Sequence, residues 1–473
     1  MKYFTILFFT YCIMSCSSNT NADNTPDVSI TTYSDVELYL TKADKSELFE
    51  FHEKSVPNYL SNINFSINVN PNITYQKIDG FGFSLTGGSA LHLNNMSSSE
   101  RSKVLTDLFS LNGIGVSYLR VSIGASDLDA EVFSYNDLLS GETDINLNQF
   151  SINKDKENLI PILKEILAIN LDIKIMGSPW SAPVWMKSNN NSIGGSLKPE
   201  YYSVYANYFV KYIKAYQSEG ITIDAITIQN EPLHDGNNPS MYMKAIDQAE
   251  FIKNHLGPAF KTAGIQTKII VWDHNADNPS YPINIYNDAD ANKYIDGAAF
   301  HLYGGKISNL SSVHNAFPDK NLYFTEQWVG VNSKFKDNLL WHTSNLIVGA
   351  ARNWCKTVLE WNLASNSKLE PHTPGGCTEC LGAITIDGNN VTKNSAYYII
   401  AHASKLVRPG SKRISSTNST DLPNVAFKTP NNEIVVIIAN NTSIDKSFNI
   451  NVLDEPVTTS LKAGSVGTYV WKL

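Results

Sequence analysis

Short apolar runs alternate with amphipathic stretches through most of the chain, from about residue 80 to about residue 362. Each run is almost wholly apolar, which is typical of a strand buried on both faces of a parallel sheet. Eight runs are predicted as strands, at residues 80–85, 117–123, 173–178, 225–229, 268–272, 297–301, 322–326 and 357–362.

Helical periodicity fills several of the intervals between these strands. Residues 158–170 and 201–216 each place large apolar side chains at three- and four-residue spacing, on one helix face. Eight βα units predict an α/β fold, a (β/α)8 TIM barrel. An open doubly wound sheet is the alternative, but it predicts a phosphate-binding glycine loop after the first strand, and the segment from Gly80 to Ser84 does not fit that pattern.

The two ends of the chain have a different, all-β character. Residues 433–439, 447–452 and 468–472 are β-branched or alternating runs, and residues 65–69 alternate in the same way with no helix after them. We therefore expect a side β-sandwich built from the N- and C-terminal segments. The expected domains are a signal peptide (1–16), a flexible tether (17–35), N-terminal strands (36–76), the barrel (77–393) and the C-terminal β-sandwich (394–473).

The first residues form a targeting segment. Lys2 precedes an apolar run, residues 3–14, that is too short to span a membrane, and the run ends in Ile13-Met14-Ser15-Cys16. This arrangement resembles a bacterial lipoprotein signal and predicts lipidation at Cys16. It indicates an exported lipoprotein in the outer membrane of a Gram-negative bacterium, on the cell-surface or the periplasmic face. The alternative is a plain secretory signal in which the cysteine is incidental.

The composition excludes one class of binding partner. The 473 residues carry a net charge of −8, and no basic patch stands out, which argues against nucleic acid. Aromatic residues reach 11%, which suits either a packed core or platforms for sugar rings. We expect a monomer.

Three cysteines follow the signal. Cys355 lies in an apolar segment and is expected to be a buried thiol. Cys377 and Cys380 form a Cys-x-x-Cys loop, which in an exported protein favours a disulfide. Zinc would need two further ligands, with His372 the nearest candidate, and a redox role lacks a thioredoxin-like context.

Two glutamates stand where predicted strands end. Glu231 follows the fourth strand, between Asn230 and Pro232, and Glu326 ends the seventh. These strands lie roughly across the mouth of a barrel, so their carboxyl ends can direct both side chains into one cleft. Paired carboxylates are the minimal apparatus for cutting a glycosidic bond.

Seven longer segments carry a specific resemblance. They are Asp79-Gly80-Phe81-Gly82, Tyr118-Leu119-Arg120-Val121, Gly177-Ser178-Pro179-Trp180-Ser181-Ala182-Pro183, Asn230-Glu231-Pro232, His301-Leu302-Tyr303, Thr325-Glu326 and Trp361-Asn362-Leu363-Ala364. In these segments the chain is similar to glycoside hydrolase family 30, which contains lysosomal glucosylceramidase and microbial β-1,6-glucanases.

The resemblance implies roles for these residues. Glu231 would be the acid/base and Glu326 the nucleophile of a retaining, two-step mechanism that needs no cofactor and no metal. The expected substrate-binding residues are Arg120, Asp127, Trp180, Asn230, His301, Tyr303 and Trp361.

The loops resemble the bacterial β-1,6-glucanase branch, notably the run from Trp272 to Asn275 and the Cys377–Cys380 loop. A tethered enzyme is also suited to a large extracellular glycan, so we expect β-1,6-glucan as substrate. An exo-acting β-glucosidase, a glucosylceramidase or a β-xylosidase of the same family is the alternative. A non-catalytic glycan-binding lipoprotein is the alternative of another class.

Overall fold

The computed structural model describes residues 35–53, 56, 58–60, 63, 65–453 and 456–472. The predicted signal peptide with Cys16, and all but the last residue of the predicted tether, lie outside the described residues. Among the described residues, none of the helices combines the length and the apolar character that crossing a membrane requires.

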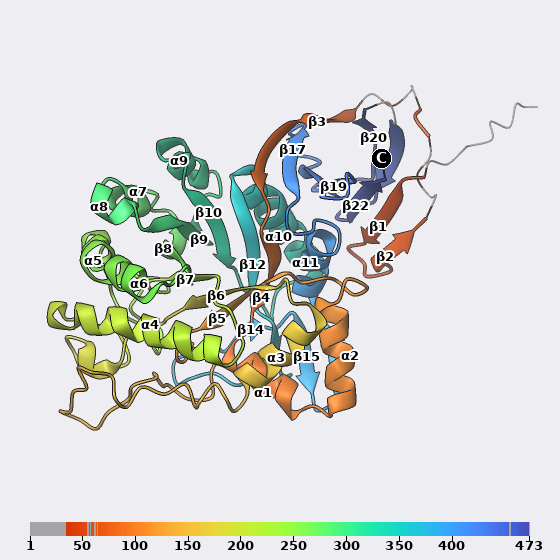
Figure 1. Ribbon diagram of the computed structural model, residues 1–473. Helices are drawn as coiled ribbons and strands as arrows, with labels where there is room; N and C mark the ends of the chain where they lie inside the picture. The colour runs from red at the N-terminus through yellow and green to blue at the C-terminus, as the bar shows by residue number, and fades with distance from the viewer. Residues whose placement is uncertain are drawn as a thin grey trace, which may run out of the picture. The chain divides into compact units, whose positions relative to one another are not determined.

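Eight parallel strands close into a barrel, which confirms the predicted TIM barrel (Figure 1). The last strand pairs with both the seventh and the first, so the sheet has no open edge as a doubly wound sheet would. In barrel order the strands are β4 (Gly80–Ser84), β5 (Tyr118–Ser122), β6 (Lys174–Ser178), β7 (Ala225–Thr227), β8 (Lys268–Ala276), β9 (Ile295–Gly305), β10 (Asn321–Glu326) and β12 (Cys355–Asn362).

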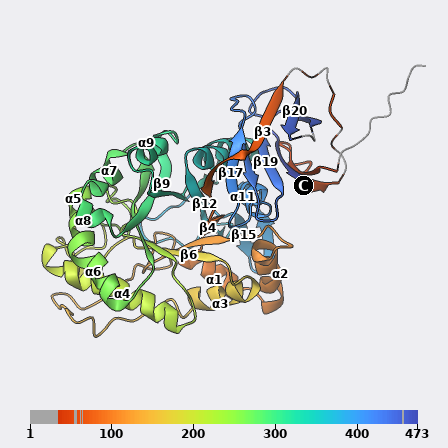
Figure 2. The same cartoon turned by 45° about the horizontal axis from the view of Figure 1, so that its top comes forward.

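Helices surround the barrel strands, as Figure 2 shows for α4 and α6 to α9. The predicted helices at 158–170 and 201–216 correspond to α3 and α4. The helices are α1 (Gly87–Asn95), α2 (Ser98–Phe109), α3 (Leu159–Ile169), α4 (Tyr202–Ser218), α5 (Ala245–Phe251), α6 (Gly257–Ala263), α7 (Ser280–Tyr286), α8 (Ala289–Asn292), α9 (Asn309–Ala316), α10 (Phe335–His342) and α11 (Ser395–Ser404), with 3-10 turns η1 (Val184–Met186) and η2 (Pro199–Tyr201) and π-helical turns η3 (Ile252–Leu256) and η4 (Thr343–Ala350).

A layer of buried side chains fills the interior of the barrel. Because parallel strands alternate their side chains, every second residue points inward, and the barrel is packed rather than hollow. Polar groups therefore gather beyond this layer, at the two ends of the barrel. The side chains of this interior layer are those of Tyr118, Met176, Ala225, Ile270, Ala299, Tyr323 and Leu359.

Strands from both ends of the chain form the side β-module, as predicted (Figure 1). The long strand β3 joins them, because it pairs antiparallel with β17 and parallel with β20. The order is β2-β1-β22-β19-β18-β17-β3-β20-β21. The bounds are β1 (Glu37–Thr41), β2 (Leu48–His52), β3 (Ser66–Lys77), β17 (Lys412–Ser416), β18 (Asn424–Lys428), β19 (Ile434–Ala439), β20 (Lys446–Val452), β21 (Val457–Leu461) and β22 (Val466–Trp471).

The change from barrel to β-module differs from the expected position at residue 394. Helix α11 comes first and packs against β4 of the barrel, and the β-strands begin only at Lys412. All ten residues of α11 are buried, so the segment lacks the polar face that would have made its helical period visible in the sequence.

Short strands in the loops at the barrel mouth complete the fold. The pair of β11 and β14 is antiparallel and ties the loop after β10 to the loop after β12. These strands are β11 (Val329–Gly330), β13 (Ala364–Ser365), β14 (Cys380–Leu381), β15 (Ile384–Asp387) and β16 (Asn390–Lys393).

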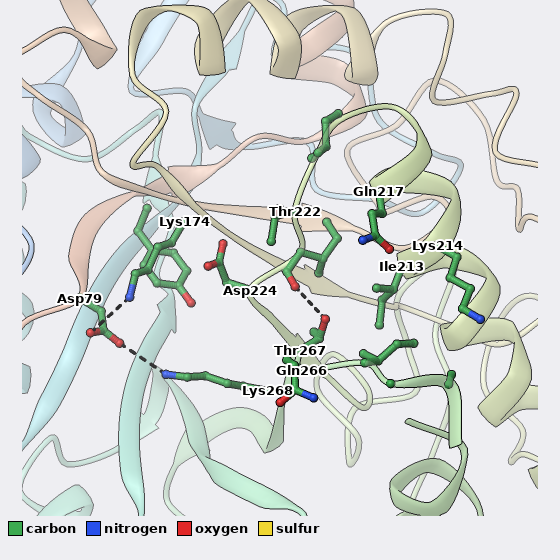
Figure 3. A pocket seen from close by; sticks show the side chains of 16 residues that line it. Asp79, Lys174, Ile213, Lys214, Gln217, Thr222, Asp224, Gln266, Thr267 and Lys268 are labelled. Atoms are coloured by element: carbon green, nitrogen blue, oxygen red, sulfur yellow. Dashed lines mark hydrogen bonds and ion pairs between the residues drawn. The ribbon is translucent and has the colours of Figure 1, made fainter. Parts of the chain in front are cut away.

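A cavity of about 440 Å³ lies at the opposite end of the barrel, where the strands begin (Figure 3). Asp79 lies there between Lys174 (3.6 Å), Lys268 (4.0 Å) and Lys356 (3.3 Å). These ion pairs link the amino-terminal ends of several strands. Residues at this face of a TIM barrel serve stability, whereas the chemistry belongs to the other face.

Candidate active site

The two glutamates predicted from the strand pattern face each other at the carboxyl ends of β7 and β10. An oxygen of Glu231 lies within 4.8 Å of an oxygen of Glu326, and both side chains are largely buried. Glu231 has a left-handed backbone (φ 46°), and its N–H donates to the carbonyl of Asp273 at 2.9 Å. Pro232 has no N–H to extend the strand, so the chain leaves the sheet at this point.

Arg120, at the centre of the site, is fully buried and donates hydrogen bonds to four neighbours, of which the Ser178 hydroxyl is the most distant at 3.2 Å. Its Nη1 donates to Glu326 Oε2 at 2.6 Å, and its Nη2 donates to Asn230 Oδ1 at 2.7 Å and to Asp273 Oδ2 at 2.8 Å. The guanidinium also lies over the ring of Trp180, at 4.8 Å from the ring centre. Since the amide oxygen of Asn230 is committed to Arg120, its NH2 group is oriented as a donor.

Asp273 enters the site because β8 is irregular. Trp272 (φ 72°) and Asp273 (φ 65°) both have left-handed backbone at a shift in the β8–β9 register. Such a bulge re-aims a side chain, and backbone strain of this kind clusters at functional sites. The Asp273 carboxylate accepts hydrogen bonds at 2.7 Å from the hydroxyls of Ser178, Thr227 and Thr325.

His301 and Tyr303 both point from β9 into the site, as their alternation predicts. His301 Nδ1 lies 3.1 Å from Glu231 Oε1, and its Nε2 lies 3.2 Å from Asp273 Oδ1. The Tyr303 hydroxyl donates to Glu326 Oε1 at 2.9 Å. Each glutamate therefore has a donor, and His301 bridges Glu231 to the buried aspartate.

Burial and charge shift the titration of this cluster. Burial lowers the pKa of His301, but the negative charges of Glu326, Asp273 and Glu231 outweigh it and raise that pKa to about 9. His301 is therefore charged at neutral pH. Burial also disfavours ionisation of Asp273, yet Arg120 and His301 hold its pKa well below the usual value.

The pKa values of the two glutamates are shifted in opposite directions. Burial raises the pKa of Glu326 and outweighs the charges of His301 and Arg120, which lower it. Burial acts on Glu231 as well, but the hydrogen bond and charge of His301 bring its pKa below the usual value. Because the carboxylates interact closely, they titrate as a pair.

A cavity of about 180 Å³ lies above the glutamates. Trp180 and Trp361 stack on each other at its wall, with ring centres 5.4 Å apart. Asp127 also lines the cavity, where burial and the charges of Glu326 and Glu231 raise its pKa to about 7. All nine residues predicted for catalysis and sugar binding thus lie at one site.

Cys377 and Cys380 form a disulfide at the edge of this cavity. Cys380 packs with Trp180 and Trp361, and the Cys377 N–H donates to Asp127 Oδ2 at 3.2 Å. The disulfide loop is therefore part of the wall that holds the aromatic pair and the aspartate. Cys355 is a buried free thiol, as expected.

Several other aromatic and titratable residues near the strand ends do not line the catalytic cavity. Trp272 and Trp185 are buried and donate through their ring N–H to backbone carbonyls, so neither is an outer sugar platform. Glu360 pairs with His342 at 2.8 Å and does not line the catalytic cavity. His274 is buried, with Nε2 at 3.9 Å from Glu231, and burial lowers its pKa to about 4.

Sequence reasoning assigned no role to Asp273. The available signal was the polar residues at the carboxyl ends of apolar strands, namely Ser178, Thr227 and Thr325, whose hydroxyls need a buried acceptor.

Glu231, His301 and Glu326 are also close enough to hold one cation. Such an ion would compete with the charges of Arg120 and His301 for the same carboxylate oxygens.

Comparison with known proteins adds a family to this geometry. The family model of the glycosyl hydrolase family 30 TIM-barrel domain matches residues 78–407, and that of the family 30 β-sandwich domain matches residues 410–469. The chain belongs to glycosyl hydrolase family 30. The family 30 barrel match extends through α11, in agreement with the packing of that helix on the barrel.

Relatives within family 30 are similar over most of their length. An endo-1,6-β-D-glucanase of Aspergillus fumigatus is 34% identical over 82% of this chain and 82% of its own. The lysosomal acid glucosylceramidase of Mus musculus is 28% identical over 86% of this chain and 83% of its own. The solved structure of the endo-β1,6-glucanase BT3312 superposes with a TM-score of 0.85 at 36% identity, over 93% of this chain and 99% of that one.

Proposed function

We propose that this family 30 protein is a retaining glycoside hydrolase that cleaves β-1,6-glucan. The observation that carries the proposal is the close approach of Glu231 and Glu326, within 4.8 Å at their oxygens. Retaining glycosidases hold their two carboxyl groups about 5–5.5 Å apart, whereas inverting enzymes leave room for a water between more distant groups. The β-1,6-glucanases among the relatives support the linkage.

In the first step, Glu326 attacks the anomeric carbon and Glu231 protonates the leaving oxygen. In the second step, Glu231 takes a proton from water, which releases the covalent glycosyl-enzyme with net retention. The loss of negative charge on glycosylated Glu326 lowers the pKa of Glu231 further and suits it to act as a base.

The first step requires a protonated Glu231 and an ionised Glu326. In the free site, however, the pKa of Glu231 is lowered and that of Glu326 is raised, so the acid proton needs a source. Arg120 cannot give up a proton, and its 2.6 Å contact favours the anionic form of Glu326 that attack requires, against the effect of burial. His301 Nδ1, 3.1 Å from Glu231, can pass its proton to that carboxylate. We infer that the His301–Glu231 pair stores the proton that reaches the leaving oxygen.

The remaining predicted residues bind the sugar in this proposal. Asn230 donates to the 2-hydroxyl, a contact that strengthens in the transition state. Asp127 accepts from sugar hydroxyls, and Trp180 and Trp361 provide an apolar wall against the C–H face of the ring.

Product analysis tests the proposal. The enzyme is incubated with pustulan, a linear β-1,6-glucan, beside laminarin, xylan and glucosylceramide, with Glu326→Gln as the inactive control. We expect cleavage of pustulan with the β-anomer of the new reducing end formed first in proton NMR spectra. First appearance of the α-anomer would refute the two-step scheme, and an intact pustulan would refute the substrate.

The glucosylceramidase relative favours a second candidate, an exo-acting β-glucosidase of the same family. Release of glucose alone from pustulan, without intermediate oligosaccharides, would support it. Binding to β-1,6-glucan without any hydrolysis across the panel would instead support a non-catalytic glycan-binding protein.

We further propose that the protein is a lipoprotein anchored through Cys16 to the outer membrane, where a tethered hydrolase meets an extracellular glycan. The signal pattern that ends at Cys16 supports this. Labelling with a fatty-acid analogue and membrane fractionation of the full chain test it, because Cys16→Ser should lose both the label and the outer-membrane association. Label retained in that variant would refute the anchor.

A further inference from the structure

A second cavity adjoins the catalytic one. Its volume is about 540 Å³, within the range of about 300–1,000 Å³ that is typical of ligand pockets. Trp328, two residues after Glu326, is half-buried and lines both cavities, so they meet at its ring. The second cavity extends from there to helix α10 and to the disulfide loop.

Two tryptophans bracket this second cavity. Trp328 stands at the catalytic side, and Trp341 lines the cavity from α10 with 41% of its surface exposed. An indole ring left open to solvent beside a cavity has an unused apolar face. Such a face suits the C–H face of a pyranose ring.

A buried acceptor also lines the cavity without a partner. Gln327 is only 7% exposed, and its Oε1 has no hydrogen bond from any residue in the described part of the chain. Burying an unsatisfied carbonyl costs free energy, which a hydroxyl donor from a ligand would recover. This unmet acceptor is an observation independent of the aromatic pair, and it points to a hydroxylated ligand.

The charge of the lining selects the class of ligand. Asp337 and Glu379 contribute carboxylates, and Asn332 and Asn338 contribute amides. Among the described residues that line this cavity, none is a lysine or an arginine. Carboxylates and amides accept from neutral sugar hydroxyls, whereas a polyanionic glycan would be repelled.

A strand pair and a disulfide hold the wall of the second cavity in place. The β11–β14 pair holds Gly330 opposite Cys380, and the Val331 N–H donates to the Glu379 carbonyl at 3.0 Å. The disulfide from Cys377 to Cys380 closes the loop that carries Glu379. The same loop therefore lines both cavities and fixes them relative to each other.

We propose that this cavity is an additional glucan subsite, in which neutral glucosyl residues of the chain being cut lie between Trp328 and Trp341. The inference rests on the proposed function, since it takes the ligand to be the same β-1,6-glucan chain that passes Glu231 and Glu326. The subsite lengthens the stretch of polymer that the enzyme recognises and leaves the reaction at the anomeric carbon unchanged.

Substitution of Trp341 separates this role from catalysis, because the side chain lines only the second cavity. Trp341→Ala is compared with unmodified enzyme on pustulan and on the shortest β-1,6-gluco-oligosaccharide that the enzyme cleaves. We expect kcat/KM on pustulan to fall about tenfold through KM, the scale of loss for one buried aromatic anchor. The value for the short substrate stays unchanged, and Trp341→Phe recovers most of the loss.

Phe51→Ala is the matched control, since Phe51 is an aromatic residue of similar exposure (48%) on β2 of the side module. Binding is measured separately in the Glu326→Gln background by affinity electrophoresis in pustulan gels, where the Trp341→Ala change should reduce retardation. If Trp341→Ala matches Phe51→Ala in both assays, the subsite is refuted while the function stands. If the unmodified enzyme neither binds nor cuts pustulan, both are refuted.

Discussion

Replacement of Asp273 by asparagine removes one negative charge from the centre of the site at almost constant shape. The carboxylate accepts on Oδ2 from Arg120, Ser178 and Thr227, and on Oδ1 from Thr325 and His301. An amide has one oxygen, which must face the guanidinium because Arg120 offers only donors. The NH2 group then faces His301 Nε2, which can accept from it only as a neutral imidazole.

The expected change in the pKa of His301 follows from its contact with Asp273. At about 4 Å and an effective dielectric constant of about 20, two unit charges interact by about 4 kcal/mol. One pKa unit corresponds to about 1.4 kcal/mol, so loss of the Asp273 charge lowers the pKa of His301 by up to about 3 units. Glu326 and Glu231 remain as anions beside His301, so we expect its pKa to fall from about 9 by roughly 1–3 units.

Activity reports this shift if the His301–Glu231 pair supplies the acid proton. The basic limb of the pH profile of kcat/KM on pustulan should then move down by the same 1–3 units, and activity at pH 6 should fall less than activity at pH 8.5. The matched control is Glu360→Gln, which removes a buried carboxylate paired with His342 outside the catalytic cavity. An unchanged basic limb in Asp273→Asn would refute the proton-storage reasoning.

Three further predictions follow from the site. Glu231→Ala should lower pustulan cleavage by about 10²–10⁴-fold but spare the first step for aryl glycosides with acidic leaving groups. With such a substrate, a burst of released phenol followed by slow turnover is the expected result. Loss of both steps alike would contradict the acid/base role. The raised pKa of His301 means that its charged form stabilises the fold below pH about 6.5 and that this contribution is lost as the pH rises through about 9. The urea midpoint should therefore fall between pH 7 and 10, and His301→Gln should flatten that slope; an equal slope in the variant would contradict the assignment. Cys377→Ser with Cys380→Ser should raise KM several-fold through the loosened cavity wall and keep kcat, whereas an unchanged KM would contradict the role of the disulfide in holding that wall.

The barrel and its two glutamates could be predicted from the sequence because both depend on local pattern. Strands buried on both faces must be apolar, so Glu231 and Glu326 stand out where the apolar runs end. The helix α11 was missed for a related reason, since its burial on every side removes the periodicity that identifies helices.

Asp273 could not be placed from the sequence, because its role depends on a local break in regular structure. A regular strand would alternate its side chains, whereas the left-handed residues Trp272 and Asp273 change which one points inward. The sequence shows an aspartate near a strand end and no sign of the bulge that turns it toward Arg120.

The amino-acid pattern by itself thus determined the architecture, the positions of the paired carboxylates and the resemblance that assigned their roles. The tertiary structure decided the charges they carry and the cavities beside them. A pKa depends on burial and on neighbours from other strands, as at His301 between three carboxylates. The Trp328–Trp341 cavity likewise exists only because a disulfide loop and a helix from different βα units meet beside the catalytic site.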